Sequence, residues 1–201
     1  MSVNLQKGQK VDLTKGNSRL RHIMVGLGWD QIEQRRGFFS SKPAEIDCDA
    51  TAFLIATDTG TIYGGGDIVY FGNLQHTSGH VVHQGDNLTG AGDGDDEQIF
   101  VDLENLNPAY SKIVFVVNIY QARERRQHFG MIRNAFIRLV DADTGSELCI
   151  FNLSENYENM TAMIFGEVYR KEGDWKFNAI GQATNDNDIV SLARRFGFQT
   201  N

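Results

Sequence analysis

Short runs of apolar and β-branched residues recur along the whole chain, and glycine-rich turns separate them. Residues 50–56 and 113–119 are nearly continuous apolar runs, which is typical of buried sandwich strands. Residues 98–103 and 135–141 alternate between apolar and polar side chains, as half-buried strands do. The chain has 21 glycines but only 2 prolines, which favours tight turns over rigid linkers. This pattern predicts a mainly β fold, an antiparallel β-sandwich with a few short helices.

Six further segments are expected to be strands of the same sandwich. They are residues 23–29, 68–71, 80–83, 147–153, 162–170 and 175–181. Helical pattern is scarce and is clearest near the C-terminus, where Asp188 is a candidate N-cap and Gly197 a candidate end of a helix. The apolar face of this helix would consist of Ile189, Leu192, Ala193 and Phe196. No linker or Pro/Ser-rich stretch divides the pattern, which predicts a single domain over residues 1–201.

The charge and hydropathy of the chain argue against several classes of protein. The formal net charge is −7, from 26 acidic and 19 basic residues, whereas nucleic-acid binding needs a concentrated basic face. No stretch approaches the roughly 20 apolar residues of a transmembrane helix, so we expect no transmembrane segment. Residues 1–7 are polar and lack the apolar centre of a signal peptide, which indicates a cytoplasmic protein. Cys48 and Cys149 each lie in an apolar strand-like run, as buried free thiols do.

The most informative segment is the glycine-rich stretch 85–97. Five carboxylates crowd into it with no lysine or arginine between them: Asp86, Asp93, Asp95, Asp96 and Glu97. Two carboxylates about 4 Å apart repel each other by about 1 kcal/mol in water, and by several times more near a protein surface. A hard cation offsets this repulsion, and Ca²⁺ accepts about 6–8 oxygen ligands in flexible geometry. Because the donors are all oxygens, Ca²⁺ is favoured over Zn²⁺ or Cu²⁺.

The acidic stretch is not an EF-hand, although its length fits one. Leu88 and Gly90 stand where an EF-hand needs ligands, and Ala91 stands where it needs glycine. Other loops must therefore complete the site. Asp47 and Asp49 are the natural candidates, because alternate residues of a strand share one face.

These two acidic segments define the predicted metal ligands. They are Asp47, Asp49, Asp86, Asn87, Asp93, Asp95, Asp96 and Glu97, with Asn87 offering an amide oxygen. Asp30 and Asn73 are second candidates, since both follow strands that could return to the edge where Asp47 lies. The residues alone leave open whether either of them joins. The competing interpretation is a solvated acidic loop that deters aggregation, which the additional pair at 47 and 49 disfavours.

Other conspicuous residues have simpler explanations. His76, His80 and His83 are expected to lie at the surface rather than form a soft-metal site, because only two of them would share a strand face. Trp29 and Trp175 are expected in the core.

Seven segments form an ordered set of motifs along the chain. They are residues 5–14 (LQKGQKVDLT), 25–30 (VGLGWD), 46–54 (IDCDATAFL), 85–90 (GDNLTG), 92–97 (GDGDDE), 134–138 (NAFIR) and 165–170 (FGEVYR). Together they resemble the TerD family, the tellurite-resistance and general-stress proteins of bacteria, over nearly the whole chain. Two positions depart from the family pattern. Cys48 replaces the usual aliphatic residue between two aspartates, and Gly64-Gly65-Gly66 loosens the segment before Asp67. Neither departure removes a predicted ligand.

The resemblance implies a β-sandwich that binds two Ca²⁺ ions through its acidic loops. It also implies a role in resistance to tellurite, oxidants or other chemical stress, without established catalysis. Family members act within membrane-associated stress complexes, which implies other stress-resistance proteins as partners and a peripheral position at the inner membrane for a cytoplasmic protein. We therefore expect a calcium-binding protein that is not an enzyme and acts through metal-dependent interactions.

Two other functions stay open at this point. One is a metal-dependent enzyme, but no His/Glu general-base pair lies near the acidic stretch, and no G-x-S-x-G or P-loop motif occurs. The other is a module that binds a small ligand such as a nucleotide. A sandwich can hold such a ligand, although nothing in the sequence supports it specifically.

Overall fold

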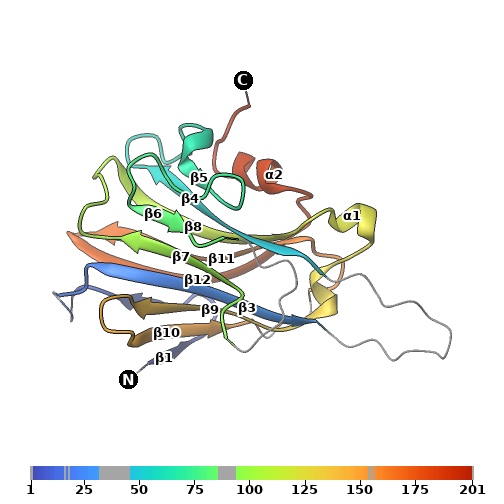
Figure 1. Cartoon of the computed structure of the whole chain (residues 1–201), viewed down its shortest axis with the longest axis horizontal. Coiled ribbons are helices and arrows are strands. Elements are labelled where there is room, and N and C mark those ends of the chain that lie inside the picture. The colour runs from blue at the N-terminus through green and yellow to red at the C-terminus, as the bar shows by residue number, and fades with distance from the viewer. Residues whose placement is uncertain are drawn as a thin grey trace.

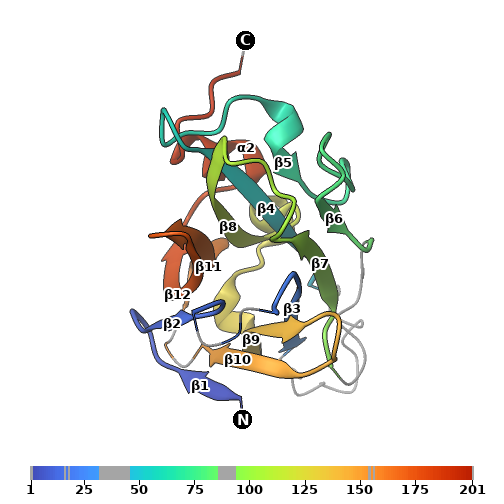
Figure 2. The same ribbon diagram turned by 90° about the vertical axis from the view of Figure 1, so that its left-hand side faces the viewer.

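Two six-stranded β-sheets face each other across the main hydrophobic core, as Figure 1 and Figure 2 show from two sides. The computed structural model describes residues 2–15, 17, 19–31, 46–85, 94–153, 155 and 157–200. Sheet A contains, in spatial order, β1 (Val3–Leu5), β10 (Glu147–Asn152), β9 (Ile132–Asp141), β3 (His22–Gln31), β7 (Glu97–Asp102) and β6 (Val81–His83). Sheet B contains β2 (Lys10–Asp12), β12 (Asp174–Thr184), β11 (Ala162–Lys171), β8 (Tyr110–Ile119), β4 (Cys48–Ala56) and β5 (Ile68–Val69).

The predicted antiparallel sandwich is confirmed, with one exception in its pairing. β1 runs parallel to β10, whereas every other described pair of strands is antiparallel. The sequence patterns did not reveal β1 or β2, because each has three residues with mostly exposed side chains and too little length for a periodicity. Trp29 and Trp175 are both buried in the main core, as expected.

Strand β4 is buried at every position, which explains its continuous apolar run. Cys48, Ala50, Ala52 and Leu54 face the main core between the sheets. Because strand residues alternate between faces, Phe53 lies on the opposite side, in a second hydrophobic cluster outside sheet B.

A short C-terminal helix, α2 (Ile189–Arg194), covers this outer face of sheet B (Figure 1). Asp188 caps it by accepting a hydrogen bond from the Ser191 backbone N–H at 2.7 Å, as the sequence predicted. Gly197, with a φ of +77°, follows the helix in the left-handed conformation that favours glycine. The predicted apolar face also packs as expected, since Leu192 and Ala193 are fully buried in the second cluster.

The remaining helical pieces are short. They are α1 (Ala122–Arg125) and the 3₁₀ turns Gly65–Asp67 and Phe129–Met131. Across the described ranges, we find no helix with the length and apolar character that crossing a membrane requires.

Leu192→Ala is expected to destabilise the protein by about 2–5 kcal/mol, because it opens a cavity between α2 and sheet B. Val190→Ala on the same helix is the control, since Val190 is exposed and should change stability by less than about 1 kcal/mol. Denaturant titration monitored by far-UV circular dichroism measures both. Similar losses for the two variants would contradict the proposed packing of α2.

Candidate functional site

Two side chains from sheet A cap the free edge of β4 in sheet B. β5 pairs only with Ala52 and Phe53, so it does not reach the backbone of Ala50. The Ala50 N–H instead donates to Glu97 Oε2, and the Ala50 carbonyl lies 3.2 Å from His83 Nε2. This contact ties the first residue of β7 to the start of β4, and it buries the Glu97 carboxylate between the two sheets.

The thiol of Cys48 lies where several predicted ligands converge. Burial raises its pKa well above the usual value, and the negative charges of Asp49, Glu97, Asp47 and Asp96 raise the pKa further. Asp47 and Asp49 flank Cys48 in the chain, and Asp96 and Glu97 lie at the start of β7, where Glu97 contacts Ala50 of β4. The high pKa also makes Cys48 a structural thiol, as buried apolar surroundings generally do.

Asp96 lies in a partly buried place close to two other carboxylates. Burial raises the pKa of its carboxyl group, and the charges of Asp30 and Asp95 raise it further, against a hydrogen bond of 2.7 Å from the Trp29 backbone N–H. Asp30 accepts a hydrogen bond from Asn134 Nδ2 at 2.7 Å, and both line an open cavity of about 490 Å³ beside Gly94. The structure thus brings Asp30, a second candidate from the sequence, close to the acidic stretch.

Asp95 has a different environment from its neighbours in the sequence. Its carboxylate receives two hydrogen bonds from the Arg138 guanidinium, at 2.7 and 2.9 Å, and one from Gln98 Nε2 at 3.1 Å. Gly26 makes room for it, since a Cβ there would lie 2.3 Å from the carboxyl group. The Asp95 side chain is 1% exposed and lies on the outer face of sheet A, paired with a cation from the chain itself.

The structure therefore sorts the predicted ligands into groups. Asp47, Asp49, Asp96 and Glu97 gather around Cys48, and Asp95 is bonded to Arg138. The second candidate Asn73 belongs to a turn, in which its Nδ2 donates to the Ile68 carbonyl at 2.8 Å. Asp86, Asn87 and Asp93 lie outside the described residues. Within the described ranges, no group of three or more His, Cys, Asp or Glu side chains is arranged to hold a metal ion.

The expectation that the three histidines lie at the surface was wrong for two of them. His76 and His83 are buried, and His80 is partly exposed. His76 Nε2 lies 3.2 Å from Asp67 Oδ1, so its polar ring has a partner inside the protein. His83 shares the buried face of Val81 in β6, an alternation that could have indicated its position.

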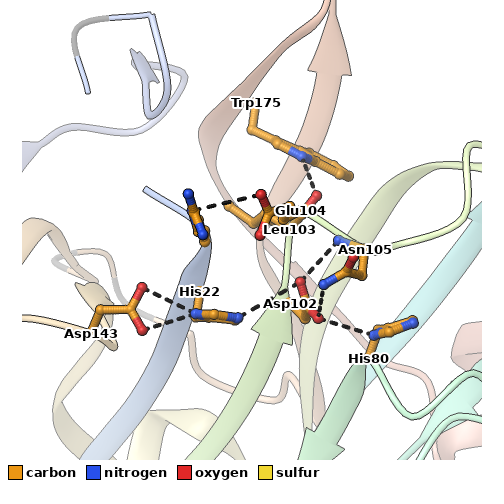
Figure 3. Close-up of polar contacts among 9 residues, drawn as sticks. His22, His80, Asp102, Leu103, Glu104, Asn105, Asp143 and Trp175 are labelled. Atoms are coloured by element: carbon orange, nitrogen blue, oxygen red, sulfur yellow. Dashed lines mark hydrogen bonds and ion pairs between the residues drawn. The ribbon is translucent and has the colours of Figure 1, made fainter. Parts of the chain in front are cut away.

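A second polar network closes the opposite end of sheet A (Figure 3). His22 lies between Asp143, 2.9 Å from Nδ1, and Asp102, 3.9 Å from Nε2. His80 Nδ1 lies 3.1 Å from Asp102, and Asn105 donates to Asp102 through both its backbone N–H and its Nδ2. Burial raises the pKa of Asp102. The hydrogen bonds from Asn105 and the electrostatic interactions with His22 and His80 lower the pKa by more, so the net shift is downward. The acids at this end therefore have basic partners.

Comparisons with known proteins agree with this architecture. The TerD domain family matches residues 1–196. The Stress response protein SCP2 of Bacillus subtilis (strain 168) is 46% identical over 200 residues, covering 98% of this chain and 100% of the relative. The Tellurium resistance protein TerD of Serratia marcescens is 44% identical over 197 residues, covering 98% of each chain. The crystal structure of SCO6318 from Streptomyces coelicolor A3(2), a homologue of telluride resistance protein (TerD), shares the fold. It has a TM-score of 0.64 at 22% identity and covers 87% of this chain and 95% of that one.

Arg138→Met is expected to destabilise the protein by about 2–3 kcal/mol, because it leaves the Asp95 carboxylate buried without its cation. The loss of unfolding free energy should be smaller than for a fully buried ion pair, since the Arg138 side chain is 31% exposed. Arg133→Met, an exposed position on the same strand, is the control and should stay within about 0.5 kcal/mol of the parent protein. Equal effects in denaturant titrations would show that Asp95 does not depend on Arg138.

Proposed function

Because the chain belongs to the TerD family, we propose that it is a calcium-binding protein of the bacterial stress response, of the tellurium-resistance type. It acts through metal-dependent protein interactions rather than by catalysis. Its partners are other stress-resistance proteins, in a complex that associates with the inner membrane.

The observation that supports calcium binding is the number of carboxylates near the start of β4, where Arg125 lies 3.5 Å from one of them, Asp47. The pKa of the Cys48 thiol is raised by burial and by the charges of four carboxylates: Asp47, Asp49, Asp96 and Glu97. Burial and the charges of neighbouring carboxylates also raise the pKa of Asp96 itself. Carboxylates that repel one another in a partly buried place destabilise the fold unless a cation neutralises them. The donors are oxygens, which fits Ca²⁺.

The carboxylates also lie on two sides of β4, which supports two ions rather than one. Glu97 lies between the sheets, whereas Asp49 faces outward from sheet B. The ions would be held by Asp47, Asp49, Asp96 and Glu97, together with Asp86, Asn87 and Asp93. Asp95 would contribute least, because Arg138 already neutralises it. Bound Ca²⁺ supplies the positive charge that turns repulsion among these groups into attraction.

The relatives' names refer to stress response and tellurium resistance, which fits a role in the stress response. An ion surrounded by protein oxygens offers no coordination position to a substrate. Several exchangeable waters on the ion would instead favour the alternative, a metal-dependent enzyme.

Glu97→Gln is expected to weaken Ca²⁺ binding by more than about tenfold, because it removes a ligand charge but keeps the shape and an acceptor for the Ala50 N–H. Calorimetric titration of the chelator-treated protein measures the affinity. Asp143→Asn removes the same charge at the opposite end of sheet A and should change the affinity by less than about twofold. Equal losses would mean that net charge, rather than a defined site, attracts the ion.

Removal of Ca²⁺ by a chelator is expected to lower the melting temperature by about 5–10 °C, while the far-UV spectrum at room temperature hardly changes. An ion at about a hundred times its dissociation constant stabilises the native state by about 2.7 kcal/mol. The sheets persist without it, because the apolar strands β4 and β8 form a core of their own. A melting temperature indifferent to chelator and to added Ca²⁺ would refute calcium binding.

A further inference from the structure

A cavity of about 570 Å³ lies beside α2 on the outer side of sheet B. Its floor is formed by Asp49 of β4 and Asn118 of β8, which are directly opposite each other in the strand register. The start of α2 forms one wall, and the residues after β5 and after β8 form the others. The volume is in the usual range for a pocket that holds a small organic molecule.

The floor of the cavity presents hydrogen-bond acceptors that are deeply buried. Asp49 and Asn118 are each 3% exposed. Within the described part of the chain, Asn118 Oδ1 has no hydrogen-bond partner. A buried amide oxygen without a donor destabilises the fold. Asn118 also interrupts the buried apolar half of β8, where packing alone would favour another aliphatic residue.

The rim of the cavity is aromatic and apolar. Phe71 lies edge-on to both Tyr70 and Tyr120, with ring centroids 5.1 and 6.4 Å apart. Three large apolar side chains of the lining are exposed to solvent: Phe71, Tyr120 and Val190. The lining residues themselves are negatively charged, since they include Asp49, Glu124 and Asp188 and, among the described ones, no lysine, arginine or histidine. The Arg125 guanidinium lies beside the rim, 5.1 Å from the centroid of the Tyr120 ring.

These features restrict the chemistry of a ligand. An anion would be repelled by the lining carboxylates. A purely apolar molecule would bury Asp49 and leave the Asn118 oxygen without a donor, at a cost in free energy. A protonated amine supplies donors to both groups, and aromatic rims favour organic cations through their ring faces. We propose that this cavity binds a small organic cation, an ammonium group carried on an apolar or aromatic body.

This proposal does not depend on calcium binding, although Asp49 is also among the proposed calcium ligands. Asp49 points away from Glu97, so an amine beside Asn118 would compete with the ion proposed on the outer side of sheet B and would leave the carboxylates between the sheets available to metal. The binding test is therefore run on the full chain both with chelator and with saturating Ca²⁺.

Tyramine and 4-ethylphenol are suitable probes, because they share a ring and an ethyl chain and differ in the ammonium group. Titrations followed by protein NMR should show tyramine binding about tenfold more tightly than 4-ethylphenol, with shifts at Asn118 and the Tyr120 backbone. Asp49→Asn should weaken tyramine binding by about tenfold, and Phe71→Ala by about threefold or more. Phe71 is exposed, so its variant stays informative if Asp49→Asn folds poorly.

Two matched controls carry the same chemical changes outside the cavity. Asp143→Asn removes one negative charge, and Leu74→Ala truncates an exposed apolar side chain; each should alter tyramine binding by less than about twofold. Competition between Ca²⁺ and tyramine would support the proposal, since both would then contact Asp49. Equal affinity for the two probes would overturn it. The proposal would also be overturned if the NMR signals of the cavity residues shifted on addition of Ca²⁺ but not on addition of tyramine.

Discussion

The burial of β4 on both faces is the constraint on which the rest of the structure depends. Its inward side chains belong to the core between the sheets, and its outward ones require a second layer, which α2 supplies. Its edge also needs cover, because β5 is only two residues long. Glu97 and His83 provide that cover at Ala50, so a carboxylate and an imidazole are buried where they cap the edge of the strand.

The electrostatics of sheet A differ between its two ends. At one end, Asp102 and Asp143 have histidine partners, and on the outer face Arg138 neutralises Asp95. At the other end, four carboxylates lie near Cys48 and raise the pKa of its thiol. Two of them also have basic neighbours, since Asp47 lies 3.5 Å from Arg125 and Glu97 lies 3.5 Å from His83. The proposed Ca²⁺ would balance the remaining negative charge at this end.

Much of the fold could be predicted from local patterns. The long strands show apolar runs or alternation, and Asp188 with Gly197 defines the terminal helix through short-range hydrogen bonds and backbone conformation. Local patterns were insufficient for β1 and β2, which are held by pairing with distant strands. They also failed for His76, whose burial depends on Asp67 and on the Tyr110 ring beside it.

The sequence by itself determined the longer strands, the capped helix, the family and the two acidic segments. Only the tertiary structure decided which of the acids meet. Asp95 and Glu97 are two residues apart, yet one is bonded to Arg138 outside sheet A and the other to Ala50 between the sheets. Asp49 and Asn118 become neighbours through the register of β4 and β8. Register and sheet packing depend on contacts between residues far apart in the chain, which the local periodicity of a strand does not contain.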